Sequence, residues 1–314
     1  MSKLIKKILK SENIILARHE FPDFDALGSQ FGLFYWIKEN FPNKKIYCLG
    51  TNVPNKFPDL FFEQKDIPDE VFSNSLVIIC DVRATDRVDD QRYKNSNNIF
   101  VIDHHIKKEE KTFEHDSIII ESASSTCEII AQELLSIIDK YKLPMKSIHS
   151  LFLGIVTDTG RFLYSNTNKN TYEVVLKFKE LGLQEKPLYD KLTVSNLTSR
   201  KFASQIVNNM KITKKGVGYY ILNHKVLKKS KMEYSEAKDY VFAMAGIEEV
   251  KIWAFCSYDI DKKQYRISLR SRNYNVNKIA AKYGGGGHMY ASGCKVDKLS
   301  IFKKIINDLN LLIE

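Results

Sequence analysis

The sequence predicts an α/β protein, in which a mostly parallel sheet flanked by helices is joined by a helical linker to a second, smaller α+β domain. In the first half of the chain, short apolar runs alternate with helical segments, as is typical of parallel sheets. From Ile212 onward, strand-like runs with alternating polar and apolar residues indicate a separate domain. The expected boundaries are 1–185 for the first domain, 186–206 for the linker and 207–314 for the second domain.

The composition is that of a globular protein large enough for two cores, with 314 residues, 44% of them hydrophobic and 27% charged. No apolar run approaches the ~20 residues that span a bilayer, and the lysine-rich start predicts an amphipathic helix rather than a signal peptide or membrane anchor. The five scattered cysteines favour reduced, buried thiols and a cytoplasmic location. The net charge of +10 fits a phosphate-rich partner and the lysine bias of an AT-rich genome equally well.

The first predicted strand, 14–17, leads into a loop that carries His19, Asp23 and Asp25 before a helix over 26–37. An imidazole and two carboxylates at this spacing can converge on one cation or on two adjacent ones. A single aspartate would be enough to cap the helix. The presence of two aspartates with a histidine therefore favours a metal site over capping alone.

Two further predicted strands also end at acidic residues. The apolar strand 75–80 is followed by Asp81, and the strand 98–102 is followed by Asp103–His105. Buried aspartate and histidine are costly unless they are paired or bound to a metal. In parallel sheets, ligands bind beyond the carboxyl ends of the strands. We therefore expect these residues to gather at one edge of the sheet, with a turn-forming role for Asp81 as the alternative.

The rest of the first domain is predicted to be mainly helical after a short strand over 117–120. A helix is expected to begin at Ser125 or Thr126, where free amides could also face a phosphate. A buried helix over 147–156 leads to Asp158, a further carboxylate that follows a core element. The sequence thus predicts that Asp158 joins the same acidic site.

The second domain is predicted to contain strands over 216–222, 252–258 and 264–270, and a helix over 235–245. The last two strands form a hairpin, and the strict alternation of 264–270 places Arg270 on its exposed face. Beyond them, four glycines precede a histidine. A glycine run can turn its backbone amides toward an anion. This pattern favours phosphate binding over a flexible connector.

The chain carries, in order, His19-x-x-x-Asp23-x-Asp25, Asp81, Asp103-His104-His105, Asp158 and Gly-Gly-Gly-Gly-His. In residue types and order these motifs resemble the DHH phosphoesterase superfamily, whose DHH-associated C-terminal domain carries the glycine signature. The resemblance covers essentially the whole chain. The length and two-domain plan are most similar to the NrnA-like group, cytoplasmic nano-RNases that also dephosphorylate 3′-phosphoadenosine 5′-phosphate (pAp). One departure is the bulky Met289-Tyr290 pair that follows the glycine run.

The resemblance implies a role for each motif. Two divalent metal ions would share Asp81, and the implied ligands are His19, Asp23, Asp25, Asp81, His104 and Asp158. The implied catalytic residues are Asp81, Asp103, which would orient ligands, and His105, which would face the scissile phosphate. The implied substrate contacts are Arg87, Arg270, Gly286, Gly287 and His288.

The function implied by the resemblance is degradation of short RNA oligonucleotides to nucleoside 5′-monophosphates and dephosphorylation of pAp, by attack of a hydroxide shared between two metals. Mixed oxygen and nitrogen ligands without thiolates suit Mn²⁺ better than zinc, with Mg²⁺ as the other choice. The alternatives are a phosphodiesterase for linear or cyclic dinucleotides (pApA or cyclic di-AMP), a RecJ-like single-strand DNA exonuclease, and a nucleotide-binding protein without catalysis. The resemblance also allows a homodimer.

Overall fold

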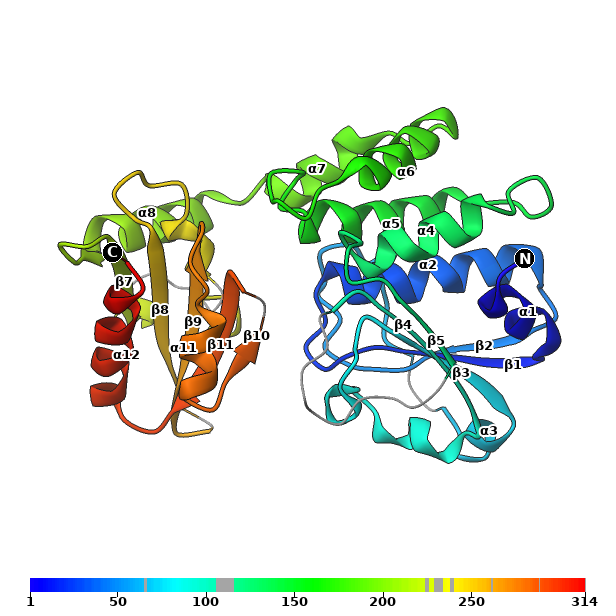
Figure 1. Cartoon of the computed structure of the whole chain (residues 1–314), viewed down its shortest axis with the longest axis horizontal. Helices are drawn as coiled ribbons and strands as arrows, with labels where there is room; N and C mark the ends of the chain where they lie inside the picture. The colour runs from blue at the N-terminus through cyan, green and yellow to red at the C-terminus, as the bar shows by residue number, and fades with distance from the viewer. Residues whose placement is uncertain are drawn as a thin grey trace. The chain divides into compact units, whose positions relative to one another are not determined.

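The first half of the chain is built on a parallel five-stranded sheet in the order β2-β1-β3-β4-β5. The computed structural model describes residues 1–64, 67–105, 116–223, 226–228, 234–237, 240–260, 262–287 and 289–313. They form two units, Met1–Thr193 and Val194–Glu314 (Figure 1). The five strands are β1 (Asn13–Ala17), β2 (Lys45–Cys48), β3 (Ser75–Cys80), β4 (Asn98–Asp103) and β5 (Asp116–Ile119), and all their pairings are parallel. The predicted α/β class with a mostly parallel sheet is confirmed.

Helices cover both faces of this sheet, which explains why β3 is buried along its whole length. In Figure 1, α2 lies along one face with α4 and α5 packed behind it, and α3 lies on the opposite side. The helices of the first unit are α1 (Lys3–Lys10), α2 (Phe24–Asn40), α3 (Glu70–Ser73), α4 (Thr126–Leu135), α5 (Met145–Asp158), α6 (Lys169–Glu180) and α7 (Glu185–Thr193). Two short 3₁₀ helices, Thr85–Arg87 and Gln91–Asn95, lie between β3 and β4.

The lysine-rich start of the chain forms the amphipathic helix α1. Leu4, Ile5 and Ile8 are buried in the core of the first unit, as predicted for a helix packed on the body. Lys3 and Lys7 on its other face pair with Asp116 at the start of β5. No helix in the described ranges is both long enough and apolar enough to cross a bilayer. All five cysteines are buried and unpaired.

Glycines allow helices α2 and α5 to cross at close range. A Cβ atom on Gly28 of α2 would clash with the carbonyl oxygen of Ser150 on α5. A Cβ on Gly154 of α5 would clash with Sγ of Cys127 and would lie 3.0 Å from Oδ1 of Asp25. The lack of side chains at these positions therefore lets the first turn of α2, the start of α4 and the last turns of α5 meet.

The second unit has a six-stranded sheet in the order β10-β11-β9-β8-β7-β6. Among the described strands of this second sheet, the β7–β8 pairing is parallel and the others are antiparallel. The alternation predicted for 264–270 is confirmed, because Ile267 and Leu269 are buried while their neighbours are partly exposed. The strands are β6 (Lys211–Ile212), β7 (Val217–Leu222), β8 (Ile252–Asp259), β9 (Gln264–Ser271), β10 (Gly286–Gly287) and β11 (Ala291–Val296).

Helices α11 (Asn277–Lys282) and α12 (Leu299–Leu311) pack against this sheet. The helix predicted over 235–245 is described as α10 (Tyr234–Ala237) and a separate 3₁₀ helix, Tyr240–Met244. Helix α8 (Leu197–Asn209) begins within the segment predicted as a linker, and its Phe202 packs into a core cluster of the second unit. The boundaries 1–185, 186–206 and 207–314 stay a prediction.

The glycine crossing gives a first prediction. We expect Gly28→Ala to lower the free energy of unfolding of the first unit by about 1–3 kcal/mol, because the backbone carbonyl that it meets cannot rotate away. Gly32→Ala is the matched control on the same helix, since its Cβ would meet the side chain of Leu151, which can adjust. Urea unfolding measures both variants, and equal losses would contradict this account of the crossing.

Candidate metal centre

The candidate centre lies at the carboxyl edge of the parallel sheet, where β1, β3 and β4 end side by side. Strand β1 pairs with β2 on one side and with β3 on the other. The chain therefore adds β2 on one side of β1 and the later strands on the other side, so the order of the strands reverses here. Such a reversal opens a crevice at the strand ends, which is the usual ligand site of open α/β sheets. The residues that follow these strands, with the first turn of α2 and the last residue of α5, supply all six predicted metal ligands.

The first group consists of His19, Asp23 and Asp81, whose ligand atoms lie within 4.8 Å of one another. Nε2 of His19 is 3.4 Å from Oδ2 of Asp81 and 3.9 Å from Oδ1 of Asp23. Nδ1 of His19 lies 2.8 Å from the carbonyl oxygen of Glu20 and must donate to it. With Nδ1 as the donor, Nε2 faces the two carboxylates, an arrangement that a cation would stabilise.

Asp23 has two roles. Its Oδ1 accepts hydrogen bonds from the amides of Asp25 and Ala26, so Asp23 caps α2 as the capping hypothesis predicted. It also belongs to the first group of possible metal ligands. Capping and metal binding are compatible, because a carboxylate offers about four lone-pair sites and both capping bonds go to Oδ1.

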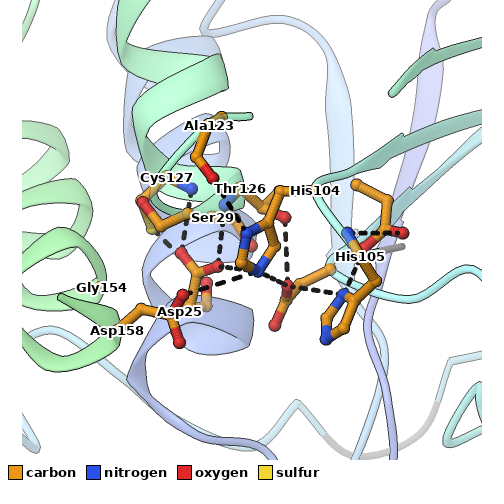
Figure 2. A network of polar contacts seen from close by, with 12 residues as sticks. Asp25, Ser29, His104, His105, Ala123, Thr126, Cys127, Gly154 and Asp158 are labelled. Atoms are coloured by element: carbon orange, nitrogen blue, oxygen red, sulfur yellow. Dashed lines mark hydrogen bonds and ion pairs between the residues drawn. The ribbon is translucent and has the colours of Figure 1, made fainter. Parts of the chain in front are cut away.

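The second group consists of Asp25, His104 and Asp158. Nε2 of His104 lies 3.7 Å from Oδ2 of Asp25 and 3.6 Å from Oδ2 of Asp158 (Figure 2). It is also 3.7 Å from Oδ1 of Asp81. Nδ1 of His104 faces the carbonyl oxygen of Ala123 at 3.3 Å, which again turns Nε2 toward the carboxylates. Asp81 thus offers Oδ2 to the first group and Oδ1 to the second.

Asp103 is fully buried and holds His105. Its Oδ1 is 2.7 Å from Nδ1 of His105, and its Oδ2 accepts the backbone amide of the same residue at 3.2 Å. Burial alone would raise the pKa of Asp103, but the bond to His105 and the nearby imidazoles outweigh it and lower that pKa. The residue that Asp103 orients is therefore His105, while His104 is oriented by Ala123.

The N-terminus of α4 binds Asp25. The amides of Thr126 and Cys127 donate to Oδ2 and Oδ1 of Asp25 at 2.8 and 2.9 Å (Figure 2). The sequence left open that these amides face a phosphate; they hold a carboxylate of the chain instead. Ser125 is the N-cap residue, as predicted, because its hydroxyl accepts the amide of Glu128.

The crowded carboxylates change the protonation of the centre. Burial, followed by the charges of Asp25 and Asp23, raises the pKa of Asp81 well above its usual value. Burial and Asp25 likewise raise the pKa of Asp158 to about 8. Burial opposes the charged form of His104, but the carboxylates of Asp25 and Asp158 outweigh it and raise its pKa. Carboxylates that resist full ionisation at short range fit divalent cations, because bound positive charge removes the repulsion.

Two residues that position the centre carried only weak signals in the sequence. Arg18 is fully buried beside His19 and donates to Gln30, Asp89 and the carbonyl oxygen of Thr51. The only hint was an arginine at the end of an apolar strand. Thr126 donates its hydroxyl to Oδ1 of Asp81 at 3.0 Å. Nothing local to residue 126 reveals a partner 45 positions away.

Arg87 lies on the rim of this region. Its carbonyl oxygen accepts the amide of Glu20, next to an antiparallel bridge between His19 and Val88. Its side chain is exposed to solvent. The neighbouring Arg83 is instead committed to the carbonyl oxygen of His105 and to Glu121. Backbone pairing therefore keeps Arg87 near the loop of the first metal group.

The glycine run lies in the second unit, where β10 pairs with β11. Gly287 faces Ser292 in that pairing, and Arg270 on β9 faces Ala291, so Arg270 and the glycines gather at one end of β11. Gly287 has a φ of 135°, and a Cβ there would lie 2.5 Å from the carbonyl oxygen of Ala291. Only glycine fits this position.

Asn277, at the first position of α11, fastens the glycine loop. Its Nδ2 donates to the carbonyl oxygen of Gly287 at 2.5 Å and lies 3.1 Å from Oγ of Ser292. His288, predicted as a substrate contact, lies outside the described residues.

Comparisons with known proteins agree with this arrangement. The model of the DHH family, N-terminal domain, matches residues 13–155, and that of the DHHA1 domain matches residues 217–314. The chain is 33% identical over 311 residues to the "Probable bifunctional oligoribonuclease and PAP phosphatase NrnA" of Streptococcus mutans, covering 99% of this chain and 98% of that protein. It is 32% identical over 312 residues to the "Bifunctional oligoribonuclease and PAP phosphatase NrnA" of Bacillus subtilis, with the same coverage.

A solved structure shows the same fold. The crystal structure of an exopolyphosphatase-related protein from Bacteroides fragilis superimposes with a TM-score of 0.87 at 22% identity, covering 98% of this chain and 96% of that chain.

The raised pKa values of the centre give a second prediction. Asp158 (pKa about 8) and Asp81 bind protons more tightly in the folded state than at an ordinary aspartate pKa of about 3.9, and His104 is shifted in the same direction. Their contribution to stability is complete below the unfolded pKa and is lost as the pH rises through the folded pKa. The free energy of unfolding of the metal-free protein should therefore fall between about pH 4 and pH 8.

Urea unfolding at several pH values measures this slope. Trp36 and Trp253 are the only tryptophans, one in each unit, so Trp253→Phe leaves fluorescence that reports on the first unit. Asp158→Asn should flatten the slope. Asp90→Asn is the control. Arg92 lowers the pKa of Asp90 against the effect of burial, so the contribution of Asp90 to stability is lost only at pH values below about 4. A wild-type slope in the Asp158 variant would contradict the prediction.

Proposed function

The chain belongs to the DHH family of phosphoric ester hydrolases, and from that premise we propose that it cleaves short RNA oligonucleotides to nucleoside 5′-monophosphates and removes phosphate from pAp. The observation that carries the proposal is the pair of carboxylate–imidazole groups joined by Asp81. The glycine loop beside Arg270 in the second unit supports it. Two relatives that align over nearly their whole length carry this pair of activities in their names.

We propose that His19, Asp23 and Asp81 hold one divalent cation and that Asp25, Asp81, His104 and Asp158 hold the other. The mixture of oxygen and nitrogen donors favours Mn²⁺, with Mg²⁺ as the second choice. Two such cations would lower the pKa of a water bound between them and offset the charge of the phosphate oxygens.

The side chains next to the proposed cations would orient their neighbours and transfer protons. Asp103 fixes Nδ1 of His105 at 2.7 Å, so the ring is held in one orientation. We propose that Nε2 of His105 exchanges a proton with the phosphate or with the oxygen that leaves it. The anionic Asp103 stabilises the protonated ring, as required of a group that acts as a general acid.

The second unit is proposed to bind the phosphate that distinguishes short substrates. Arg270, Gly286 and Gly287 gather at one end of β11, where a guanidinium and glycine amides can surround an anion. His288 and Arg87 remain proposed phosphate contacts. A separate contact with a terminal phosphate favours substrates in which such a group is present in every molecule, namely short oligonucleotides and pAp.

A turnover panel tests the function. Purified protein with Mn²⁺ should hydrolyse pAp and di- to pentanucleotide RNA much faster than long single-stranded RNA or DNA. The linear dinucleotide pApA is included as the substrate of the alternative function. Asp81→Ala should abolish turnover of every substrate while circular dichroism stays that of a folded protein, since both cation groups lose their common ligand. Equal rates on a dinucleotide and on a long strand would rule out the proposed preference.

Arg270 gives a prediction for the second unit. We expect Arg270→Ala to raise KM for a 5′-phosphorylated dinucleotide by about ten- to a hundredfold, the effect of losing a hydrogen bond to a charged group. The KM for the dinucleotide without that phosphate should change far less. Arg266→Ala, on the same strand and face, is the control. A similar loss with both dinucleotides would show that Arg270 does not read the terminal phosphate.

A further inference from the structure

We infer that Thr126 is a positioning residue that fixes the orientation of the Asp81 carboxylate, so that each of its oxygens faces one of the two cation groups. The inference rests on the proposed two-cation centre and assigns a role to a residue outside the ligand set. Thr126 is fully buried, and its Oγ1 donates to Oδ1 of Asp81 at 3.0 Å.

Asp81 needs such a partner because its two oxygens have different neighbours. Oδ2 lies 3.4 Å from Nε2 of His19. Oδ1 lies 3.7 Å from Nε2 of His104 and 3.7 Å from Nδ1 of His105. The terminal torsion of an aspartate is broad and roughly two-fold, so it does not by itself hold this orientation. A donor that binds Oδ1 from one side removes that freedom.

The backbone of Asp81 is already unusual. Its φ is 60°, in the left-handed region that a non-glycine residue rarely adopts. The amide of Asp81 donates to the carbonyl oxygen of Ile102 at 2.9 Å, which ties it to β4. Strained residues of this kind persist where their surroundings over-determine them, most often at functional sites. The hydroxyl of Thr126 extends that control from the backbone to the carboxylate.

Helix capping does not account for the hydroxyl of Thr126. The cap of α4 is Ser125, which accepts the amide of Glu128 at 3.0 Å. Threonines inside a helix commonly donate to a carbonyl three or four residues earlier, as Thr157 does in α5. Thr126 occupies the first helical position, and its hydroxyl donates to Asp81 instead.

The same turn of α4 holds a second ligand. The amides of Thr126 and Cys127 bind the two oxygens of Asp25 (Figure 2). With the hydroxyl of Thr126, two consecutive residues thus connect Asp25 from α2 with Asp81 after β3. The buried Glu128 accepts the hydroxyls of Ser124 and Thr171, each at 2.6 Å, and thereby fastens the start of α4 to the start of α6. Thr126 is thus mounted on a fixed support, as a positioning residue must be.

Titration of Mn²⁺ into the metal-free full-length protein, followed by calorimetry, tests this role. Thr126→Val keeps the shape of the side chain and removes the donor, so the affinity for at least one of the two cations should fall about ten- to a hundredfold. Thr126→Ser, which keeps the donor, should stay close to wild type. When one Mn²⁺ is added per cation site, the electron paramagnetic resonance signal of a coupled Mn²⁺ pair should be absent in Thr126→Val and present in Thr126→Ser.

Ser147→Ala is the control for loss of a buried hydroxyl. Ser147 donates to the carbonyl oxygen of Gly32 at 2.7 Å, at the opposite end of α5 from Asp158. Wild-type binding of both cations by Thr126→Val, or an equal loss in Ser147→Ala, would overturn the inference and leave the proposed function standing. Failure of the wild-type protein to bind two cations would overturn both. If Thr126→Val does not fold, Thr126→Ala replaces it as the donor-free variant.

Discussion

Repulsion among buried carboxylates is the constraint around which the first unit is organised. Asp25, Asp81 and Asp158 come from α2, β3 and α5 and meet around Nε2 of His104. Without a cation, burial and then the neighbouring charges raise the pKa of Asp81 and Asp158, and the folded chain gains by keeping protons there. The fold must therefore impose this convergence, and it does so through helices packed closely enough to bring the carboxylates together.

The supports of the centre oppose that repulsion with fixed donors. The amides at the start of α4 bind Asp25, where the helix dipole also favours negative charge. Each of the three histidines has its Nδ1 assigned to a different acceptor: Glu20 for His19, Ala123 for His104 and Asp103 for His105. For His19 and His104 the acceptor is a backbone carbonyl, which leaves Nε2 as the ligand atom. For His105 it is a carboxylate, which stabilises a charged ring. This difference in partner distinguishes the two imidazoles proposed as metal ligands from the one proposed for proton transfer.

The sequence predicted the parallel sheet and the edge on which the acids gather, because both depend on local patterns. Apolar runs mark β3 and β4, and the residue that follows such a run lies at the strand end wherever the strands pair in parallel. Strand β2 was missed, since it is short, lies at the sheet edge, and only Cys48 of its four residues is fully buried. The partners of Arg18 and Thr126 were also beyond local reasoning. Their hydrogen bonds join residues 71 and 45 positions apart, and only the assembled fold brings them together.

The phosphate sites proposed for the two units differ in their chemistry. The first gathers acidic and imidazole groups that would need cations before they could attract an anion. The second offers backbone amides and a guanidinium, which can attract an anion directly. In the glycine loop, Nδ2 of Asn277 donates to the carbonyl oxygen of Gly287 and so holds the loop in place. A substrate with two phosphates of different status, one to be cleaved and one to be recognised, matches this division. That match argues for small, doubly phosphorylated substrates over a long strand, in which every internal phosphate is equivalent.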